Sequence, residues 1–345
     1  MKKVYIILLN YNGWKDTLEC LESVLKLECP GYQVVVVDND SPNRSMDHML
    51  SWAKGDTSAM VVNEQLKELS TPHCTKPIDF VLYNNAQALA GGDLELESRY
   101  SNPVIFIQSG DNKGFAAGNN LGIEYVLKKN DADFVWLLNN DTVIDPGALS
   151  ALLEKAQEYS RSDQKVGIIG AKLMFYDMPA IIQGVGGVYN KWLSISRHIG
   201  GSEKDIGQYN NNKVSEVMDY PIGASMFVSI NFIKNIGLMC EDFFLYYEEM
   251  DWVLRGRKKG WKIGYCWKSK VFHKEGGSIG TSSVAKDKSK LADYYGLRNR
   301  IVFTRKQFPK YIVPVLLGFF IVVFNRVRRM EFDRLGLVYR AIFDK

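Results

Sequence analysis

Short apolar runs alternate with amphipathic stretches along most of the chain. Val4 to Leu9 and Gln33 to Val37 are runs of strand length that end in Asn, Asp and Ser, and residues 14 to 27 between them carry leucines and a valine at helical spacing. Strand, helix, strand in this order predicts a parallel, right-handed crossover. Asn10 and Asp38, which follow the two strands, should therefore be neighbours at one edge of a sheet.

The same alternation resumes after a less regular region. Residues 46 to 54 could form a helix, but residues 56 to 103 show no clear period, and we interpret residues 42 to 103 as an insertion. A Gly- and Asn-rich segment, residues 190 to 212, reads as a mobile loop close to a binding site or as a plain surface loop. The remaining predicted elements are strands at Val104–Gln108, Phe134–Leu138 and Val166–Ile169, helices from Phe115 and from Pro146 to Ser160, and further β-structure at Lys172–Tyr176 and Gly184–Tyr189.

This order predicts an α/β fold with a mixed sheet flanked by helices. The 345 residues are 46% hydrophobic and 24% charged, as in an ordinary globular protein. The length favours one elaborated domain, residues 1 to 306, followed by an appendage, residues 307 to 345.

The modest net charge of +4 hides an asymmetry. Residues 1 to 252 hold 21 Lys and Arg against 33 Asp and Glu, whereas residues 253 to 310 hold 16 against 3. An acidic front could hold a metal ion, and a basic segment suits an anionic substrate, an anionic membrane surface, or both. Solvated basic helices are the simpler alternative.

A polar cluster follows the buried strand Phe134–Leu138. Ligands in open α/β sheets bind outside the carboxyl ends of the strands, and this strand delivers Asn139 and Asp141 there. Two residues apart on an extended backbone, they point to the same side and could face one hard divalent cation. The alternative is a simple Asn/Asp turn before the helix at Pro146.

A second glycine-containing loop leads into a helix at Phe115. Gly114 permits close backbone approach, and the helix start offers N–H groups to an anion, with Asn112 nearby. As a glycine-rich loop the signal is weak, because neither the G-x-G-x-x-G nor the G-K-[ST] spacing is present.

Four acidic residues follow or flank the aromatic run of residues 243 to 247. Asp251 and Arg255 are four apart on the predicted helix, which favours an ion pair. Glu248 and Glu249 diverge by about 100° on a helix, so one of them can face a cleft. Under aromatic cover, and with Trp252 close by to exclude water, its pKa should rise towards that of a general base. A glutamate that merely stabilises a helix start is the alternative.

His273 closes a predicted strand, Lys270 to Phe272, and precedes a flexible Gly-Gly. With Asp141 already offering a carboxylate, we interpret His273 as a metal ligand, against the alternative of a structural histidine. The five cysteines are odd in number and lack a C-x-x-C spacing, which argues against zinc or disulfides and fits a reducing compartment.

Seven motifs in sequence order resemble the inverting GT-A glycosyltransferases of family 2, particularly their rhamnosyltransferase-like branch, which builds bacterial surface polysaccharides. The resemblance runs from Val4 to about Lys306. The motifs are NYN after the first strand, VVDNDS, NKGFAAGNN, LLNNDT, FFLYYEEMDWVLRGRKKGW, HKEGGS and YYGLRNRIVFTRK.

The resemblance implies a function and roles for single residues. It implies transfer of a sugar, with rhamnose as the first choice, from a nucleoside diphosphate sugar to a glycan or lipid-linked acceptor, with Mn²⁺ or Mg²⁺ as cofactor and no nucleic acid as partner. Asp141 and His273 would bind metal and diphosphate, and Glu249 would be the base, with Glu248 and Asp251 beside it. The nucleotide-sugar site would comprise Asn10, Tyr11, Asp38, Asn112, Gly114, Asn139, Asp141 and Arg298.

The chain departs from the family pattern at three places. Asn139 stands where the broad family has Asp, although this branch often has Asn, and Glu249 stands where Asp is usual. The segment 42 to 103 is longer than the usual link. Two other functions stay open, a catalytically inactive sugar-binding subunit and a nucleotidyltransferase, although the latter should show a basic Gly-rich loop after the first strand.

The C-terminal appendage contains fourteen mostly apolar residues, 311 to 324, followed by arginines. This run falls short of the roughly 20 residues that cross a bilayer, so we expect a monotopic segment on an anionic membrane surface. A buried helix or a homodimer interface is the alternative. The apolar part of the N-terminus is too short for a signal peptide, and we expect a cytoplasmic protein, peripheral on the inner face of the cell membrane.

Overall fold

The structure is a computed structural model that describes residues 2–274 and 289–343. Its strands are β1 Val4–Asn10, β2 Tyr32–Asp38, β3 Phe80–Asn84, β4 Val104–Gln108, β5 Phe134–Asn139, β6 Thr142–Ile144, β7 Val166–Phe175, β8 Ile182–Gly184, β9 Gly187–Asn190, β10 Ile195–His198, β11 Ser225–Ser229 and β12 Lys262–His273. Its helices are α1 Trp14–Val24, α2 Ser45–Lys54, α3 Lys67–Ser70, α4 Asn85–Ala90, α5 Leu94–Glu97, α6 Phe115–Lys129, α7 Ala148–Arg161, α8 Lys213–Val217, α9 Ile230–Ile236, α10 Glu248–Arg257, α11 Lys290–Gln307, α12 Ile312–Arg328 and α13 Leu335–Phe343, with short 3₁₀ turns at η1 Glu64–Leu66, η3 Pro309–Tyr311 and η4 Phe332–Arg334.

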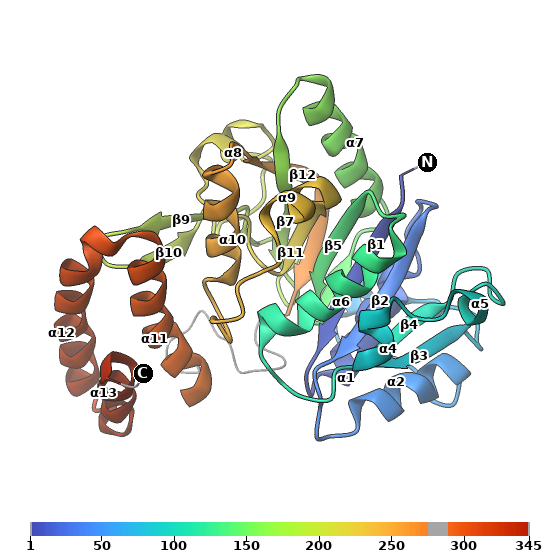
Figure 1. Ribbon diagram of the computed structural model, residues 1–345, viewed down its shortest axis with the longest axis horizontal. Coiled ribbons are helices and arrows are strands. Elements are labelled where there is room, and N and C mark those ends of the chain that lie inside the picture. Colours follow the sequence, from blue (N-terminus) through green and yellow to red (C-terminus); the bar gives the residue numbers. More distant parts are fainter. Residues whose placement is uncertain (1, 275–288, 344–345) are drawn as a thin grey trace.

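A mixed sheet forms the centre of the molecule, in the order β3-β4-β2-β1-β5-β11-β7-β12-β6 (Figure 1). The strands from β3 to β5 are parallel, and β11 then pairs antiparallel with both β5 and β7. Parallel strands bring their carboxyl ends to one edge, and Asn10 lies opposite Asp38 in the register of β1 and β2. The predicted α/β fold, the crossover and the neighbourhood of these two residues are confirmed.

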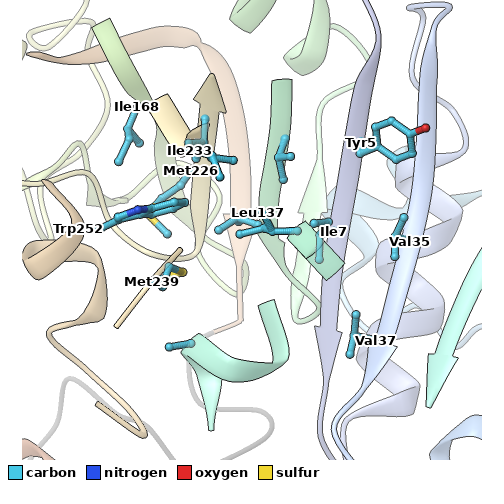
Figure 2. Packing of buried hydrophobic residues seen from close by; sticks show 14 of the residues in the cluster. Tyr5, Ile7, Val35, Val37, Leu137, Ile168, Met226, Ile233, Met239 and Trp252 are labelled. Carbon is cyan, nitrogen blue, oxygen red and sulfur yellow. The ribbon is translucent and has the colours of Figure 1, made fainter. Parts of the chain in front are cut away.

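The two faces of the sheet are covered by different helices. Alternate residues of a strand point to opposite faces, so Ile6 and Leu8 of β1 pack with α1, α2 and α7, while Tyr5 and Ile7 pack with α6 and the region of α9 and α10. Figure 2 shows the core on the face of Tyr5 and Ile7, where Ile7 and Val35 belong to the same cluster as Trp252. Most strand residues are fully buried on both faces, which explains their continuous apolar runs.

Two segments that we predicted to be irregular contain strands, while the interpretation of residues 42 to 103 as an insertion stays a prediction. Inside residues 42 to 103, β3 joins the sheet edge in parallel with β4, and α4 begins with a capping box at Asn84. The sequence of β3 is FVLYN, in which the apolar run is only four residues long and lies between polar stretches. Residues 190 to 212, expected to be a mobile loop, begin with β10, which pairs antiparallel with β9.

The last three helices, α11, α12 and α13, form a bundle with its own small core, centred on Leu297, Ile301, Val315, Phe319, Val338 and Ala341. They stand together at one end of the molecule, far from β3 and β4 (Figure 1). The helical stretch Pro309–Arg328 is 20 residues long with a mean hydropathy of 1.7, and 17% of its most apolar window is buried. By length and composition it could cross a membrane, so the prediction that this segment is too short is wrong.

Candidate active site

Asp141 and His273 meet at the carboxyl edge of the sheet. His273 is the last residue of β12, and it lies opposite Thr142 in the register with β6, one residue after Asp141. The distance between His273 Nε2 and Asp141 Oδ1 is 3.1 Å, and the amide nitrogen of Asn139 lies 3.4 Å from the same Nε2. Asn139 and Asp141 thus both contact His273, and their sharing of one divalent cation stays a prediction.

Gln183 of β8 fixes the orientation of the His273 ring. Its side-chain oxygen lies 2.9 Å from Nδ1, and Gln183 itself is buried. An Nδ1–H that donates to this oxygen leaves Nε2 with a lone pair that faces the Asp141 carboxylate. A hydrogen-bond acceptor behind a histidine is the arrangement that metal-binding histidines have in proteins.

The pair fits a divalent cation that is shared with a substrate. Two donors that each bind Mg²⁺ at about 2.1 Å and at right angles lie about 3 Å apart, which matches the Nε2–Oδ1 separation. Residues 2–274 and 289–343 contain no group of three or more His, Cys, Asp or Glu that could hold a metal. The two side chains would therefore leave most coordination positions to water and phosphate oxygens, as Mg²⁺ sites for phosphate substrates do.

Lys274 anchors this edge of the sheet to α1. Its backbone N–H donates to the Asp141 carbonyl at 2.9 Å, and its ammonium lies 2.7 Å from Asp16 and 2.6 Å from Glu19. Burial lowers the pKa of Lys274, but the two carboxylates outweigh it and raise the pKa overall. The permanently charged ammonium thus holds the backbone on both sides of the Asp141–His273 pair.

Asn10 and Asp38 belong to a buried polar cluster a short way along the same edge. Asp38 accepts hydrogen bonds from the amide of Asn10 at 2.5 Å and from the hydroxyl of Ser41 at 2.7 Å. Asn140 turns away from the Asp141–His273 pair and donates to Thr17 at 2.9 Å. Tyr11 follows β1 in a bend and is half-buried.

Gly114 caps the start of α6 beside the aromatic segment 243 to 247. Its φ is +93°, and an added Cβ would lie 2.2 Å from the carbonyl oxygen of Phe244, so only glycine fits. The N–H of Phe115 donates to that oxygen at 2.8 Å, and the N–H of Gly114 donates to Asn112 at 3.0 Å. Two of the N–H groups expected to meet an anion are thus engaged inside the protein, contrary to the prediction.

A strained turn presents the two glutamates. Tyr246 and Tyr247 both have positive φ, 71° and 76°, which costs about 1 to 3 kcal/mol for each bulky residue. The side chain of Asn299, fully buried on α11, compensates by donating to the carbonyls of Leu245 and Tyr246 at 2.8 and 3.2 Å. The turn directs α10 so that it begins with Glu248.

Glu248 and Glu249 line a cavity of about 760 Å³ together with Asn139 and His273. Burial raises the pKa of Glu249 to about 7. Burial and then the charge of Glu249 raise the pKa of Glu248 well above its usual value, and one Glu248 oxygen has no hydrogen-bond partner within the described chain. We expected that one of the two glutamates can face a cleft, and both of them border the cavity.

Three residues expected at the site lie elsewhere. Asp251 does not line the cavity, because its carboxylate accepts hydrogen bonds from Arg255 at 2.8 Å and from Gln307 at 2.6 Å. Arg298 also stays outside the cavity and donates to the Asp242 carbonyl. Trp252 points into the core, where its ring packs against Phe232, so it does not shield Glu249 from water.

Sequence reasoning missed four residues that the fold brings to the site or behind it. Gln183, Arg197 and Arg300 line the cavity, and Asn299 holds the strained turn. Arg197 lies in the segment predicted to be a mobile loop. Asn299 and Arg300 directly follow Arg298 in the motif YYGLRNRIVFTRK. Which of the three side chains faces the cavity depends on how α11 is rotated about its axis, and the sequence does not specify this rotation.

Comparison with known proteins identifies a family and a relative. The family model described as “Glycosyl transferase family 2” matches residues 5–67 and 91–207. A protein of Haloferax volcanii described as “Low-salt glycan biosynthesis hexosyltransferase Agl10” is 26% identical over 262 residues, which cover 74% of this chain and 78% of that protein. Residues 68 to 90, which include β3, fall between the two matched segments.

Solved structures share the fold. GalNAc-T7 with UDP, GalNAc and Mn²⁺ superposes with a TM-score of 0.52 at 13% identity over 87% of this chain and 50% of that one. S. aureus TarS 1-349 in complex with UDP-GlcNAc superposes with a TM-score of 0.51 at 13% identity, over 98% of this chain and 79% of that one. The mannosyltransferase PcManGT from Pyrobaculum calidifontis in complex with GDP-Man and Mn²⁺ superposes with a TM-score of 0.50 at 11% identity, over 99% of this chain and 73% of that one. The expected GT-A-like fold is confirmed.

Proposed function

The chain belongs to glycosyl transferase family 2, and from this premise we propose that it is a metal-dependent, inverting hexosyltransferase that uses a nucleoside diphosphate sugar. One observation carries the proposal. A single cavity joins His273, which contacts Asp141, to a glutamate whose pKa is about 7. Transfer with inversion needs a site for the diphosphate and a proton acceptor on the acceptor side, and this cavity offers candidates for both.

Asp141 and His273 are the proposed metal ligands, and Gln183 is the residue that orients His273. Mn²⁺ or Mg²⁺ at this position supplies positive charge for the leaving diphosphate. Two structures with the same fold are described with Mn²⁺ and a nucleotide, which supports the choice of cation. Asn10, Tyr11, Asp38, Asn112 and Gly114 remain the proposed surroundings of the nucleotide.

Glu249 is the proposed general base. A carboxyl with a pKa of about 7 is half ionised at neutral pH, and in its ionised form it accepts a proton far better than an ordinary glutamate. Burial, and then the charge of Glu249, also raise the pKa of Glu248 well above its usual value, which disfavours a second negative charge beside Glu249. Glu249 would take the proton of the acceptor hydroxyl while the hydroxyl oxygen attacks the anomeric carbon and the diphosphate leaves from the opposite side.

We propose a membrane surface as the working location. The outer face of α12 exposes Leu317, Phe320, Ile321 and Phe324 by 57 to 74%. Exposed cations stand at both ends of the helix, Lys310 before it, Arg328 as its last residue and Arg329 directly after it. An apolar face bordered by cations is typical of a helix that lies among anionic headgroups.

Rhamnose remains the proposed sugar because of the resemblance to the rhamnosyltransferase-like branch. A thermal-shift screen of nucleotide sugars with and without Mn²⁺ tests the donor assignment. We expect one nucleoside diphosphate sugar to raise the Tm, and the shift to need Mn²⁺ and Asp141. No shift with any donor at millimolar concentration would contradict the proposed function.

A further inference from the structure

The cavity has a second wall that the proposed chemistry does not use. It is built from β10, which contributes Arg197, and from α11, which contributes Asp293 and Arg300. The two elements are joined near the cavity, because the hydroxyl of Ser194 donates to the carbonyl of Arg300 at 3.3 Å. Tyr247 donates to the Ser194 carbonyl at 2.7 Å, which ties this wall to the turn before Glu248.

This wall carries a surplus of positive charge. In the part of the chain that the structure describes, neither Arg197 nor Arg300 forms an ion pair with a carboxylate. Asp293 does not neutralise them, because its carboxylate is held by Arg326 at 2.8 Å and by Arg334 at 3.1 Å. No carboxylate of the described chain therefore balances the two guanidinium groups, although the Arg300 side chain also hydrogen-bonds the Tyr247 hydroxyl. Guanidinium groups bind phosphate with paired hydrogen bonds.

The carboxyls that face the same cavity do not cancel this charge at neutral pH. Burial raises the pKa of Glu248 well above its usual value and that of Glu249 to about 7, so both carry less negative charge near neutral pH than ordinary glutamates do. Arg300 lies beside the buried Tyr247, which also lines the cavity. The charge of Arg300 lowers the pKa of the Tyr247 hydroxyl against the larger effect of burial. The wall around Arg197 and Arg300 thus favours an anionic ligand.

The same wall continues into the C-terminal bundle. Leu297 of α11 lines the cavity and also belongs to the bundle core with Val315 and Phe319 of α12. The far side of α12 is the exposed apolar face around Phe320 and Phe324. The α11–α12 pair thus has the arginine-bearing cavity wall on one side and an exposed apolar face on the other, which suit the anionic head and the hydrocarbon tail of one ligand.

We propose that Arg197 and Arg300 bind the phosphate of a lipid-linked acceptor, whose hydrocarbon chain runs along the α11–α12 bundle. This rests on the proposed glycosyltransferase function and names its acceptor class. The donor is the other possible source of phosphate. It is disfavoured because nucleotides in α/β folds bind at the carboxyl edge of the parallel strands, whereas Arg197 and Arg300 lie on β10 and α11, outside that sheet.

Binding of farnesyl phosphate in neutral detergent micelles tests the proposal, with farnesol and inorganic phosphate as comparison ligands. We expect the wild type to bind farnesyl phosphate at least 10-fold more tightly than either. The variant R197Q/R300Q should lose about 10-fold of this affinity, and R300K should recover part of the loss of R300Q. Arg99, on the surface and ion-paired with Glu95, gives the matched control R99Q, which should bind as the wild type does.

Donor affinity, measured in the same variants with the nucleotide sugar and Mn²⁺, separates the two phosphate sources. Unchanged donor affinity with weakened farnesyl phosphate supports the acceptor assignment. Equal farnesyl phosphate binding by the wild type and R197Q/R300Q, or a loss confined to the donor, would overturn it. Inorganic phosphate that binds as tightly as farnesyl phosphate would remove the lipid from the proposal. Since Arg197 is exposed, R197Q gives a folded variant even if changes at Arg300 destabilise the protein. Failure of the wild type to bind any nucleotide sugar would instead count against the proposed function.

Discussion

Two adjacent carboxyls in one cavity are the chemical centre of the molecule. Burial raises the pKa of Glu249 to about 7 and that of Glu248 well above its usual value. The ionised form of Glu249 is the active base, so activity should rise with pH as the proton leaves.

Donor hydrolysis by the wild type should therefore increase between pH 6 and pH 8, with an apparent pKa of about 7. The variant E249Q has no group to ionise and should show a low, flat profile. E95Q, which changes an exposed glutamate on α5, should keep the wild-type profile and serves as the control. A wild-type midpoint near 4.5, the ordinary value for glutamate, would show that the cavity does not tune this carboxyl.

The Asp141–His273 pair carries the second prediction at this scale. D141N removes the anionic ligand, so Mn²⁺ binding measured calorimetrically with the nucleotide present should weaken by more than 10-fold. Q183L frees the His273 ring and should weaken Mn²⁺ by about 10- to 100-fold, as is typical when the partner behind a metal ligand is lost. D177N, at an exposed position, is the matched control. Identical Mn²⁺ affinity in all four proteins would remove the pair from the metal site.

Among the elements, the turn before α10 depends on a single side chain of another helix. Asn299 satisfies the carbonyls of Leu245 and Tyr246 where two tyrosines are forced to positive φ. N299A should lower the free energy of unfolding by about 1 to 3 kcal/mol and reduce turnover, because Glu249 loses its fixed position. The control N235A removes a surface hydrogen bond to Trp261 and should leave turnover unchanged. A destabilised N299A with full turnover would show that the turn serves stability alone.

Strands that are buried on both faces, and helices with one clear apolar stripe, could be predicted from the sequence. Strands that form only because a neighbouring strand pairs with them could not. Strand Val104–Gln108 was predicted with its observed bounds, since a continuous apolar run leaves few alternatives. β3 was missed although its sequence, FVLYN, contains an apolar run, because this run is only four residues long and lies between polar stretches. β10 was missed because its residues are exposed, so that its pairing with β9 leaves no apolar pattern to read.

The candidate site divides in the same way. The local sequence pattern was enough to recognise Asp141, His273 and the two glutamates. Each of them comes at or just after the end of a predicted strand or of the aromatic run, where an apolar run gives way to polar residues. Asp251 was assigned to the site, although its i, i+4 partner Arg255 had indicated the structural role that it has. Arg197, Arg300 and Gln183 could not be predicted, because their places depend on the packing of β8, β10 and α11 around one cavity.

At the scale of the whole molecule, α12 gives the protein an apolar side. The double variant F320D/F324D changes two residues that are 74% and 65% exposed and belong to no core cluster, so the fold should be kept. We expect the wild type to sediment with phosphatidylglycerol liposomes and F320D/F324D to stay in solution. I206D, at a position that is 78% exposed and far from α12 in the chain, should behave as the wild type. Equal sedimentation of all three would contradict membrane binding through α12.

The most direct test of the account is the turnover of E249Q and E248Q beside the wild type, measured as nucleoside diphosphate release from the saturating donor with Mn²⁺ at pH 8. We expect E249Q to lose about 10²-fold or more of turnover with nearly unchanged donor affinity, because glutamine keeps the shape of the glutamate side chain but cannot accept the proton. E248Q should lose much less, because the proposed base, Glu249, is intact in this variant. Near-normal turnover in E249Q would contradict the account, and if E248Q were the inactive variant, the base would be Glu248.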